Sequence, residues 1–458
     1  MTGIIRAASF LPRHRLSRER LAEAWNRKPN PGSKAVAHFD EDSLTLAYEA
    51  AAPLVAAAGT PEIVYFAATS APFAQRSSAA LLAAALDLPT STRTADFGAS
   101  LRCGSSALRA AFDALAGGAS QVLVAAGERR EGAPESEEEE LFGDAGAAVL
   151  VGREGIQAEC LGMTSSFHDY PDEWRAPHDR FVSGSRSRAL EELGAAGHSV
   201  ACARVLLDRH QLTAENIRFA LLSAPHPKTL ETMRRQLGFG ASQLPPDYFR
   251  QTGHCGSALP LMLLASALAE ARAGDLILLT STGEGADAWL FRAVEDGPGL
   301  AAKPEPLDYP SYTIYQKLRS LPNPPSAETS PAWWAREEPG VVRLYGSRCT
   351  ACGDVQFPSA QVCPACRGRS LAPHKLRRSG TVFIVTEDFL AESPAPPTWM
   401  AVVDLDGGGR LLCQLADVQR RQARPGLRVE LVLRRLTEGP AHHPYYWKAR
   451  PMPEGRTA

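Results

Sequence analysis

The chain has 458 residues, of which 44% are hydrophobic and 22% charged, so it can bury a sizeable core and is neither disordered nor fibrous. Its formal net charge of −2 excludes a whole-chain electrostatic attraction to nucleic acid or to anionic membranes. Met1–Arg6 lacks a charged segment followed by a long apolar one, and no apolar run is long enough to span a membrane. We therefore expect a soluble, cytoplasmic protein.

Two distant segments share one pattern. Ile63–Pro72 and Ile217–Pro225 are apolar runs that both end in Ser-Ala-Pro, which predicts a buried strand followed by a loop. Downstream, Cys103-Gly104-Ser105 and Cys255-Gly256-Ser257 each begin a helical pattern. A further predicted strand follows each helix, over Gln121–Ala126 and Asp275–Thr282.

The spacing of these landmarks indicates an internal duplication. Ser70 and Ser223 lie 153 positions apart, and Cys103 and Cys255 lie 152 apart. Strands that alternate with helices imply mainly parallel sheets covered by helices, so we expect a pseudo-symmetric, layered α/β fold of about 300 residues. Ligands in such folds bind where loops leave the carboxyl ends of strands, so we expect the two halves to contribute one composite site.

Beyond residue 300 the composition changes. Eight prolines between Ala302 and Gly340 predict a linker with one short helix around Ser311–Leu321. After the linker, short β-rich runs are separated by turns such as Asp406–Gly409, which is typical of a small barrel. The predicted barrel strands are Gly380–Thr386, Met400–Leu405 and Val429–Leu433.

Cysteine spacing indicates a metal site at the start of this last unit. Four of the nine cysteines form two Cys-x2-Cys pairs, Cys349 with Cys352 and Cys363 with Cys366, and an odd number remains. That count suits a reducing compartment better than a disulfide scaffold. Four thiolates with neither a histidine nor an open position are typical of a closed, structural zinc site. The scattered cysteines in apolar surroundings are predicted core residues: Cys160, Cys202 and Cys413.

Cys103 is the candidate nucleophile of the first half. It precedes a glycine and a helical pattern, so its sulfur would lie at a helix N-terminus, where the dipole and unpaired N–H groups favour the thiolate. The same amides could hold an oxyanion when a thioester carbonyl is attacked. The alternative is a buried structural cysteine.

Two histidines lie where the duplication predicts loops at the same site. His226 follows the second Ser-Ala-Pro, where the first half has Phe73, and His254 precedes Cys255. Cysteine chemistry needs a base or cationic partner of this kind. Cys255 is predicted to pack in the core, with a second reactive thiol as the alternative. Asp144 is predicted to have a structural role in a turn, and Glu137–Glu140 is predicted to form a solvated loop.

With these residues in view, the chain resembles the thiolase superfamily, whose members form or break carbon–carbon bonds beside thioesters through a cysteine acyl-enzyme. Residues 1 to 320 are most similar to hydroxymethylglutaryl-CoA synthase and the initiating ketoacyl synthases. The segments that carry the similarity are Trp174-Arg175, Asp179-Arg180-Phe181, Ala224-Pro225-His226-Pro227-Lys228, Gly274-Asp275 and Gly283-Glu284-Gly285. From about Trp333 the chain resembles the acyl-CoA-associated zinc-ribbon plus OB-fold family, whose members commonly partner thiolase-fold subunits.

The resemblance implies a duplicated thiolase-like layered fold (α-β-α-β-α) with a C-terminal zinc ribbon and OB-fold β-barrel. It also implies a homodimer, a structural zinc ion, and a CoA or phosphopantetheine thioester as substrate, with a partner thiolase as a further possibility. The implied domains are two thiolase-like halves, a Pro-rich linker, a zinc ribbon and an OB-fold domain, over residues 1–165, 166–300, 301–340, 341–372 and 373–458.

The resemblance also implies roles for individual residues. Cys103 takes the acyl group, and His226 polarises the carbonyl of the second substrate or shuttles protons. In the nearest relatives this position is asparagine, whereas His254 resembles the histidine of thiolases and elongating ketoacyl synthases. A Cys-His-His set supports decarboxylative or reversible Claisen chemistry. The implied substrate-binding residues are Thr69, Lys228, Gly283 and Gly285.

One departure bears on the reaction. Thr69 stands where hydroxymethylglutaryl-CoA synthase has its catalytic glutamate, and threonine cannot take a proton from an acetyl methyl group. We therefore expect that synthase activity to be absent or very weak.

The sequence thus predicts a condensing acyltransferase that loads Cys103 from acyl-CoA or an acyl-carrier protein, in specialised or polyketide-like metabolism. One alternative is acyl transfer to oxygen, nitrogen or carbon of a small acceptor. Another is a non-catalytic acyl-CoA-binding scaffold for a partner thiolase. A nucleic-acid role for the OB-fold unit is disfavoured by the near-neutral charge, and no glycine motif indicates a nucleotide cofactor.

Overall fold

The computed structural model describes most of the chain. The described residues are 1–169, 173–176, 179–184, 194–300, 305–320, 339–391, 393–436 and 445–453. They form two compact units: residues 1–38 with 42–312, and residues 39–41 with 313–458. Most of the predicted linker, with Pro304, Pro322, Pro324, Pro325, Pro331 and Trp333, lies outside the described residues.

The first unit is built on nine hydrogen-bonded strands in the order β11-β12-β13-β8-β1-β7-β6-β4-β5. Their bounds are β1 (Gly3–Phe10), β4 (Ile63–Ala67), β5 (Arg93–Phe97), β6 (Gln121–Glu128), β7 (Ala145–Gly152), β8 (Ala158–Phe167), β11 (Ile217–Leu222), β12 (Leu276–Thr282) and β13 (Gly285–Ala293). The order β4-β6-β7-β1 in one half is repeated as β11-β12-β13-β8 in the other, and the halves join where β1 pairs with β8. The predicted duplication is therefore confirmed in the topology.

The direction of the strands corrects one expectation. β4 runs parallel to β5 and β6, and β11 runs parallel to β12, but β6 with β7, β12 with β13, and both neighbours of β1 are antiparallel. The sheets are therefore mixed, and the prediction of mainly parallel sheets is wrong. The reason is that β12 and β13 are joined directly by a tight turn, with no crossover helix between them. Between β6 and β7 the chain forms only the short helix α5 and then returns antiparallel beside β6.

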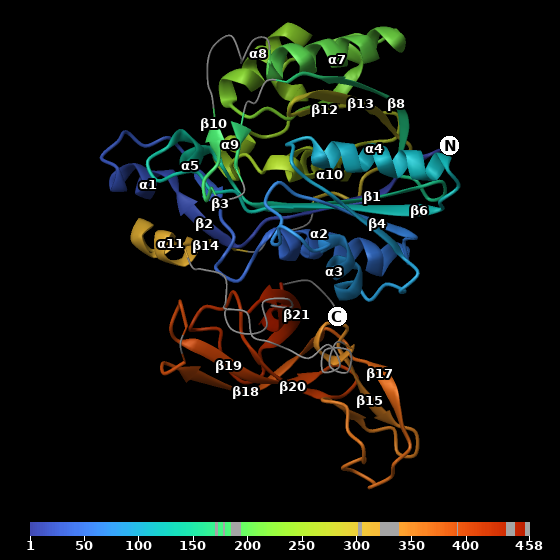
Figure 1. Cartoon of the computed structure of the whole chain (residues 1–458), viewed down its shortest axis with the longest axis vertical. Coiled ribbons are helices and arrows are strands. Elements are labelled where there is room, and N and C mark those ends of the chain that lie inside the picture. Colours follow the sequence, from blue (N-terminus) through green and yellow to red (C-terminus); the bar gives the residue numbers. More distant parts are fainter. Residues whose placement is uncertain are drawn as a thin grey trace. The chain divides into compact units, whose positions relative to one another are not determined.

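Helices cover and separate the two groups of strands. In Figure 1, α7 and α8 form one outer layer, α2 and α3 form the other, and α4 and α10 lie between the strands. The larger helices are α2 (Ser43–Ala58), α3 (Ser78–Ala85), α4 (Cys103–Ala116), α7 (Ala195–Arg209), α8 (Pro227–Leu237) and α10 (Leu259–Glu270). This is the predicted α-β-α-β-α layering. Of these helices, α10 packs on β1 and β7 of one half and on β11 and β12 of the other. Its sequence explains that place, because a leucine-rich helix that is apolar all round is stable only when it is buried on every side.

Shorter elements complete the first unit. They are α1 (Arg18–Ala24), α5 (Glu137–Leu141), α9 (Tyr248–Gln251), η1 (Ala214–Asn216), η2 (Ala241–Gln243), η3 (Gly256–Ala258), β2 (His14–Ser17), β3 (Ser33–Ala35), β9 (Glu173–Trp174), β10 (Ser183–Gly184) and β14 (Leu307–Asp308). The helix α11 (Tyr312–Arg319) lies where a short helix was predicted, at the point where the chain passes to the second unit. None of the described helices is both long and apolar enough to cross a membrane.

The second unit consists of a small three-stranded sheet and a five-stranded barrel. The small sheet has the order β16-β15-β17 and the barrel the order β20-β19-β18-β21-β22. A bridge between Leu415 and Ala449 brings the two ends of the barrel sheet together, so the barrel is nearly closed. The bounds are β15 (Tyr345–Cys349), β16 (Val355–Gln356), β17 (Leu371–Lys375), β18 (Ser379–Asp388), β19 (Thr398–Leu405), β20 (Arg410–Gln414), β21 (Arg428–Arg435) and β22 (Tyr445–Pro451). The three predicted barrel strands are confirmed as parts of β18, β19 and β21.

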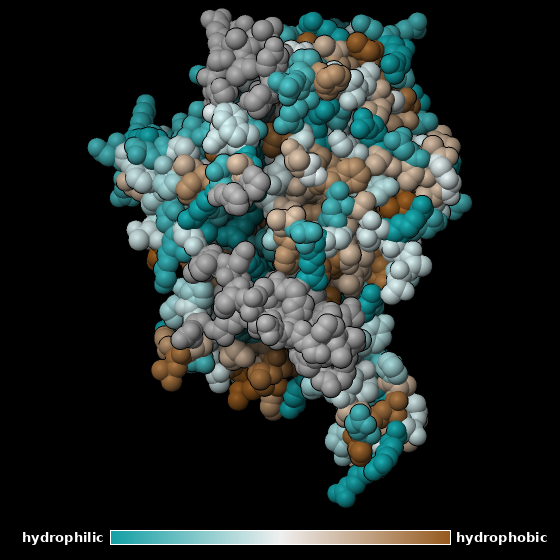
Figure 2. Space-filling model, viewed as in Figure 1, coloured by the Kyte–Doolittle hydropathy of each residue, from teal (hydrophilic) through white to brown (hydrophobic). Residues whose placement is uncertain are grey.

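The barrel exposes large apolar side chains, and hydrophobic residues gather over β18 and β19 in Figure 2. The exposed members on its strands and the following turn are Phe383, Ile384, Phe389, Leu390 and Leu412. A concentration of this kind is typical of a surface that contacts another molecule.

Candidate active site

Cys103 is the first residue of α4, as predicted, and its side chain is buried. The helix begins there against the second half of the fold. A Cβ atom built on Gly104 would lie 2.3 Å from the carbonyl oxygen of Ser257, so only glycine allows this approach. The two Cys-Gly-Ser segments of the duplication therefore meet, which is the arrangement that a composite site would need.

The surroundings of Cys103 act against the expected thiolate. Burial, and then the negative charge of Glu128, raise the pKa of the Cys103 thiol to about 12. The amides at the start of α4 act in the opposite direction but are outweighed. The effect of the helix N-terminus that the sequence analysis invoked is therefore opposed at this position.

Glu128, at the end of β6, is a site residue that sequence reasoning missed. Its carboxylate is fully buried and accepts five hydrogen bonds from two loops. The donors are the amide and hydroxyl of Thr69 (2.8 and 3.0 Å), the hydroxyl of Ser70 (2.6 Å), and the amide and hydroxyl of Ser257 (3.2 and 2.5 Å). The signal that could have found it is a glutamate at the carboxyl end of an otherwise apolar strand, where ligands bind in folds of this kind.

His254 lies in the loop before η3 and is buried. Its Nδ1 lies 3.1 Å from Nη1 of Arg130. A guanidinium can only donate hydrogen bonds, so Nδ1 accepts and the ring proton lies on Nε2. Arg130 is held in turn by the carboxylate of Glu173 and by the ring of Phe142, whose centroid is 3.8 Å from its guanidinium carbon. His254 is thus a neutral imidazole with a fixed tautomer.

His226 is the N-cap residue of α8. Its Nδ1 accepts a hydrogen bond from the amide of Lys228 at 3.1 Å, and its Nε2 lies 2.8 Å from Oε1 of Glu137. In the described part of the chain neither Cys103 nor His254 is a hydrogen-bond partner of His226. The structure therefore brings Cys103 together with the second Cys-Gly-Ser segment, whereas His226 is paired with a carboxylate.

The partner of His226 also corrects the expectation for the acidic run. Residues 137–140 form most of the helix α5 and not a solvated loop. Glu139 is buried and accepts hydrogen bonds from Trp25 Nε1 at 3.2 Å and from the hydroxyl of Tyr312 at 2.7 Å. A run of four glutamates predicts a solvated surface only when no hydrogen-bond donor of the core faces it. Here Trp25 and Tyr312 both donate to Glu139.

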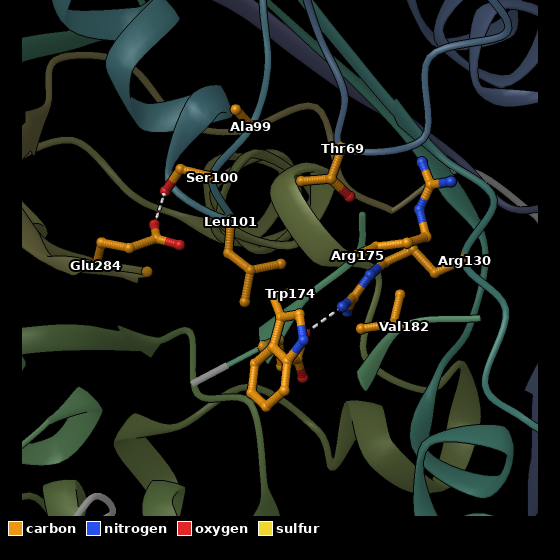
Figure 3. A pocket seen from close by; sticks show the side chains of 11 residues that line it. Thr69, Ala99, Ser100, Leu101, Arg130, Trp174, Arg175, Val182 and Glu284 are labelled. Atoms are coloured by element: carbon orange, nitrogen blue, oxygen red, sulfur yellow. Dashed lines mark hydrogen bonds and ion pairs between the residues drawn. The ribbon is translucent and has the colours of Figure 1, made fainter. Parts of the chain in front are cut away.

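A cavity opens beside the start of α4. Figure 3 shows Ser100 and Glu284 on one side, joined by a 2.5 Å hydrogen bond, and Thr69 and Arg130 on the other. The remaining lining residues are Ala99, Leu101, Glu173, Trp174, Arg175, Val182 and Gly283. Arg130 both lines this cavity and contacts His254, so it connects the cavity to the buried site.

The predicted substrate-binding residues divide into two groups. Thr69 and Gly283 line the cavity. Lys228 is exposed in the first turn of α8, and Gly285 begins β13 against the backbone of Ser166. These two residues are not among the lining of the described cavity.

The remaining candidates have structural roles. Asp144 is buried and accepts hydrogen bonds from the amides of Ala37 at 2.7 Å and Arg130 at 3.1 Å, as expected for a residue that fixes a turn. Cys255 is fully buried, and burial raises the pKa of its thiol, so the predicted packing role is supported. All nine cysteines are free, and Cys202 and Cys413 are buried as predicted, while Cys160 is partly buried against the core.

Four of the five cysteines of the C-terminal unit, Cys349, Cys352, Cys363 and Cys366, lie in a metal-binding arrangement. Their sulfurs all lie within 4.8 Å of one another, with Cys349 to Cys366 and Cys352 to Cys363 each 3.6 Å apart. Tetrahedral zinc with Zn–S bonds near 2.3 Å requires sulfurs about 3.8 Å apart, so the site fits zinc. Each pair forms the same turn, in which the amide four residues after its first cysteine donates to that cysteine's carbonyl. With four thiolates and no open position, the site stabilises the fold.

Three regions of the chain match known protein families. Residues 207–291 match the C-terminal domain of 3-oxoacyl-[acyl-carrier-protein] synthase III. Residues 333–372 match the rubredoxin-like zinc ribbon domain of ChsH2, and residues 378–434 match its C-terminal OB-fold domain. The chain therefore combines a thiolase-superfamily condensing domain with a ChsH2-type zinc ribbon and OB fold, and the predicted fusion is confirmed.

The condensing domain is similar in sequence to hydroxymethylglutaryl-CoA synthases. The protein from Pyrococcus horikoshii is 28% identical over 337 residues, which cover 69% of this chain and 95% of that protein. The protein from Methanopyrus kandleri is 29% identical over 342 residues, covering 69% and 97%.

Solved structures share the fold. A crystal structure of HMG-CoA synthase complexed with CoA matches with a TM-score of 0.60 at 18% identity, over 72% of this chain and 94% of that one. The 3-oxoacyl-[acyl-carrier-protein] synthase III of Aquifex aeolicus matches with a TM-score of 0.57 at 21% identity, over 64% of this chain and all of that one. In its general class the first unit is thus a condensing, acyl-transferring domain.

Proposed function

We propose that the protein is an acyltransferase of the condensing type that loads an acyl group on Cys103 and joins it to a second thioester or enolisable acceptor. The observation that supports the proposal is the close approach of the start of α4, where Cys103 lies, to Ser257 of the second half. The similarity to hydroxymethylglutaryl-CoA synthases and to synthase III supports a CoA or phosphopantetheine thioester as the acyl donor.

The chemistry follows from the groups that the site holds. The sulfur of Cys103 attacks the donor carbonyl, and the thiol of CoA or of the carrier leaves. In the second step the acceptor is enolised or decarboxylated, and its carbon attacks the acyl group on Cys103. The Nε2–H of His254 is the donor for the oxygen that becomes negative, and such a donor typically contributes a factor of about 10² to 10³ in rate.

We assign His226 one of two roles: it polarises the carbonyl of the second substrate, or it transfers that substrate's proton. The ring as described donates from Nε2 to Glu137, because Nδ1 accepts from the amide of Lys228. A carboxylate partner stabilises the imidazolium that a proton transfer would create. We therefore assign Glu137 the role of positioning His226.

The first experiment is intact-protein mass spectrometry after incubation with a panel of acyl-CoAs, comparing the wild type with Cys103→Ala. We expect a mass gain of one acyl group in the wild type and none in the variant. Cys413→Ala is a matched control, because that cysteine is buried in the other unit. If Cys103→Ala kept full turnover, the mechanism would be wrong. If no CoA donor loads the wild type, the same measurement with acylated carrier protein decides between carrier loading and a scaffold role.

The acceptor distinguishes the rival functions. Transfer to oxygen, nitrogen or an aromatic carbon would give a product without carbon dioxide release and without a bond between two thioesters. A non-catalytic scaffold would bind acyl-CoA without any acyl-enzyme. The retention of a cysteine and two histidines favours catalysis over the scaffold, since a decayed site should have lost some of them.

We also propose that the chain does not perform the hydroxymethylglutaryl-CoA synthase reaction. Thr69 takes the place of the catalytic glutamate in the resemblance, and its hydroxyl is a donor to Glu128 in this fold. The check is incubation with acetyl-CoA and acetoacetyl-CoA. Robust formation of hydroxymethylglutaryl-CoA would contradict the proposal.

The remaining proposals concern assembly and location. We propose a homodimer, a partner thiolase that contacts the exposed apolar side chains of the barrel, a cytoplasmic location and a role in specialised metabolism. Native mass spectrometry of the purified chain tests the dimer. Leu390→Asp, at the most exposed of those barrel side chains, is expected to weaken a complex with a thiolase while leaving Cys103 loading unchanged.

A further inference from the structure

Arg102 occupies a position that the local rules of helix formation disfavour. It is the N-cap residue of α4, and its side chain makes no capping hydrogen bond. A cation at this place faces the positive end of the helix dipole. The side chain is nevertheless largely buried, with 16% of its surface exposed. A residue that breaks a local rule in this way needs a reason from outside the helix.

The guanidinium of Arg102 contacts the second half of the fold. Nη1 lies 3.2 Å from Oδ1 of Asp287 on β13 and donates to the carbonyl of Ser166 on β8 at 2.9 Å. Nη2 donates to the carbonyl of Glu284, in the turn between β12 and β13, at 3.1 Å. Asp287 is buried and also accepts a hydrogen bond from the hydroxyl of Ser165 at 2.6 Å, so a second donor holds it in place.

The loop before α4 contacts the same turn a second time. The hydroxyl of Ser100 donates to Oε2 of Glu284 at 2.5 Å, as Figure 3 shows, and accepts from the amide of Arg102 at 3.2 Å. Gly283 of the turn has a φ of +153°, and a Cβ atom on it would lie 2.9 Å from that amide nitrogen. Only glycine therefore allows the turn to approach the loop this closely.

These contacts place the candidate nucleophile relative to the cavity. Cys103 follows Arg102 directly, and its amide donates to the carbonyl of Ser100 at 3.0 Å. Ser100, Gly283 and Glu284 all line the cavity. The side chain of Arg102 thus ties the first turn of α4 to one wall of the cavity, which the other half of the fold supplies.

We propose that Arg102 is a positioning residue for Cys103. By binding Asp287 and the carbonyl of Glu284, it holds the start of α4 against the β12–β13 turn in the geometry that acyl loading requires. The inference rests on the proposed acyl transfer and adds a residue to it. A displacement of about 1 Å in a reacting group can cost about 10²-fold in rate, so a contact that fixes this geometry bears directly on loading.

A direct contact of Arg102 with substrate is the alternative role, and the structure disfavours it. Nη1 and Nη2 are bound by the second half, and Nε is buried. Arg102 is also not among the residues that line the described cavity. Its effect on the reaction is therefore expected through the place of Cys103 and not through substrate binding.

The test compares the wild type with Arg102→Met, which keeps an apolar stem and removes the guanidinium. Mass spectrometry follows the rate of Cys103 loading over a range of concentrations of the acyl donor that loads best. The rate at saturation should fall about 10- to 100-fold, while the half-saturating concentration changes less than about threefold. Arg102→Lys should restore part of the rate, because its ammonium can face Asp287 but cannot form the forked contact.

Two further variants separate positioning from damage to the fold. Arg102→Met alone removes the cation that pairs with buried Asp287 and can destabilise the fold. The double variant Arg102→Met/Asp287→Asn removes both charges and should load at about the rate of Arg102→Met. Arg6→Met is the matched control: Arg6, on β1, pairs with Glu295 at 2.7 Å and also joins the two halves, but beyond the opposite end of β13. It should load like the wild type.

Hydrogen exchange supplies a readout that needs no acyl donor. Peptides that cover residues 98–104 and 281–287 should both exchange faster in Arg102→Met and at the wild-type rate in Arg6→Met. Circular dichroism confirms that the variants are folded.

Three outcomes overturn the inference: wild-type loading by Arg102→Met, unchanged exchange in both peptides, or an equal loss of loading in Arg6→Met. Failure of every donor to load the wild type would reject the proposed function and the positioning role with it. Faster exchange in Arg102→Met would then identify Arg102 as a structural link alone, so the two failures are distinguishable.

Discussion

Nδ1 of His254 lies 3.1 Å from Nη1 of Arg130, and this contact fixes which ring nitrogen carries the proton. The resemblance places an asparagine at this position in the related synthases. The side chain of asparagine presents an N–H donor without needing a partner such as Arg130. Histidine can do so only if its tautomer is set from the other side. Arg130 has this role, and Glu173 and Phe142 hold the guanidinium in place.

The first prediction concerns this donor. His254→Ala should lower the rate of condensation by a factor of about 10² to 10³, as loss of an oxyanion donor does, with acyl loading of Cys103 retained. His254→Asn should lose less, because its amide can also donate. Arg130→Met should lower the rate in the same direction, since the ring is free to adopt the other tautomer. Product formation and Cys103 loading are measured on the same samples.

His374→Ala, on β17 in the other unit, is the control for loss of a histidine. Equal rates for His254→Ala and the wild type would remove His254 from the mechanism. A loss of loading in all three site variants would instead indicate damage to the fold around Cys103.

A second prediction tests Thr69, which the resemblance aligns with the glutamate of hydroxymethylglutaryl-CoA synthase. Thr69→Glu would place a second carboxylate against Glu128, whose Oε1 and Oε2 already accept from the amide and hydroxyl of Thr69. Two adjacent carboxylates cannot both ionise in a buried site, so the substitution should lower the melting temperature and add no synthase activity. The double variant with Glu128→Gln should recover part of the stability.

The double-mutant cycle supplies the control for this pair. Additive losses in melting temperature would show that the two positions do not interact. Synthase activity in Thr69→Glu alone would show that Glu128 leaves room for a second carboxylate.

A third prediction concerns the metal. Removal of zinc by a chelator at neutral pH, or Cys363→Ser, should release one zinc ion per chain and open the β15–β17 region to protease, because structural zinc stabilises its domain outright. Zinc content is measured by plasma mass spectrometry and cleavage by peptide mapping. Cys413→Ser, a buried cysteine outside the site, should keep the zinc. A chain that keeps its zinc after Cys363→Ser would contradict a four-cysteine site.

The parts of the fold that could be predicted from the sequence were those that depend on short, local sequence patterns. The repeated Ser-Ala-Pro and Cys-Gly-Ser segments identified the duplication, because each half builds the same strand, loop and helix from the same residues. The two Cys-x2-Cys pairs identified the zinc ribbon. Strand direction was not predictable in this way, because a buried apolar run such as Ala145–Gly152 is the same whether its neighbour is parallel or antiparallel.

The site shows the same division. Cys103 and His254 could be proposed from the sequence because each lies beside a glycine at a helix start or loop. Glu128 was missed because its meaning depends on Ser257, 129 positions away, and on two glycines that allow the approach. Its charge, together with burial, also raises the pKa of the Cys103 thiol. A helix N-terminus favours a thiolate, but burial and a nearby carboxylate, which no local pattern reports, outweigh that effect.

The last prediction concerns the stability of the second unit. Arg434, on β21, is fully buried, with its guanidinium 2.8 Å from Asp417 and 3.0 Å from Glu41. Glu41 comes from the short segment 39–41 that belongs to this unit although it lies far away in the sequence. Arg434→Met would remove the buried cation that pairs with both carboxylates, and breaking a buried pair by removing one partner typically costs about 3 to 5 kcal/mol.

Urea unfolding, followed by the fluorescence of the buried Trp447, measures the loss. Arg410→Met is the matched control, because Arg410 forms an exposed pair with Asp404 that contributes at most about 1 kcal/mol. The Arg434 variant should unfold at clearly lower urea, and the control should unfold close to the wild type. Equal midpoints for both variants would mean that the acidic side chains are neutral in the folded unit and that Arg434 is not needed to balance them.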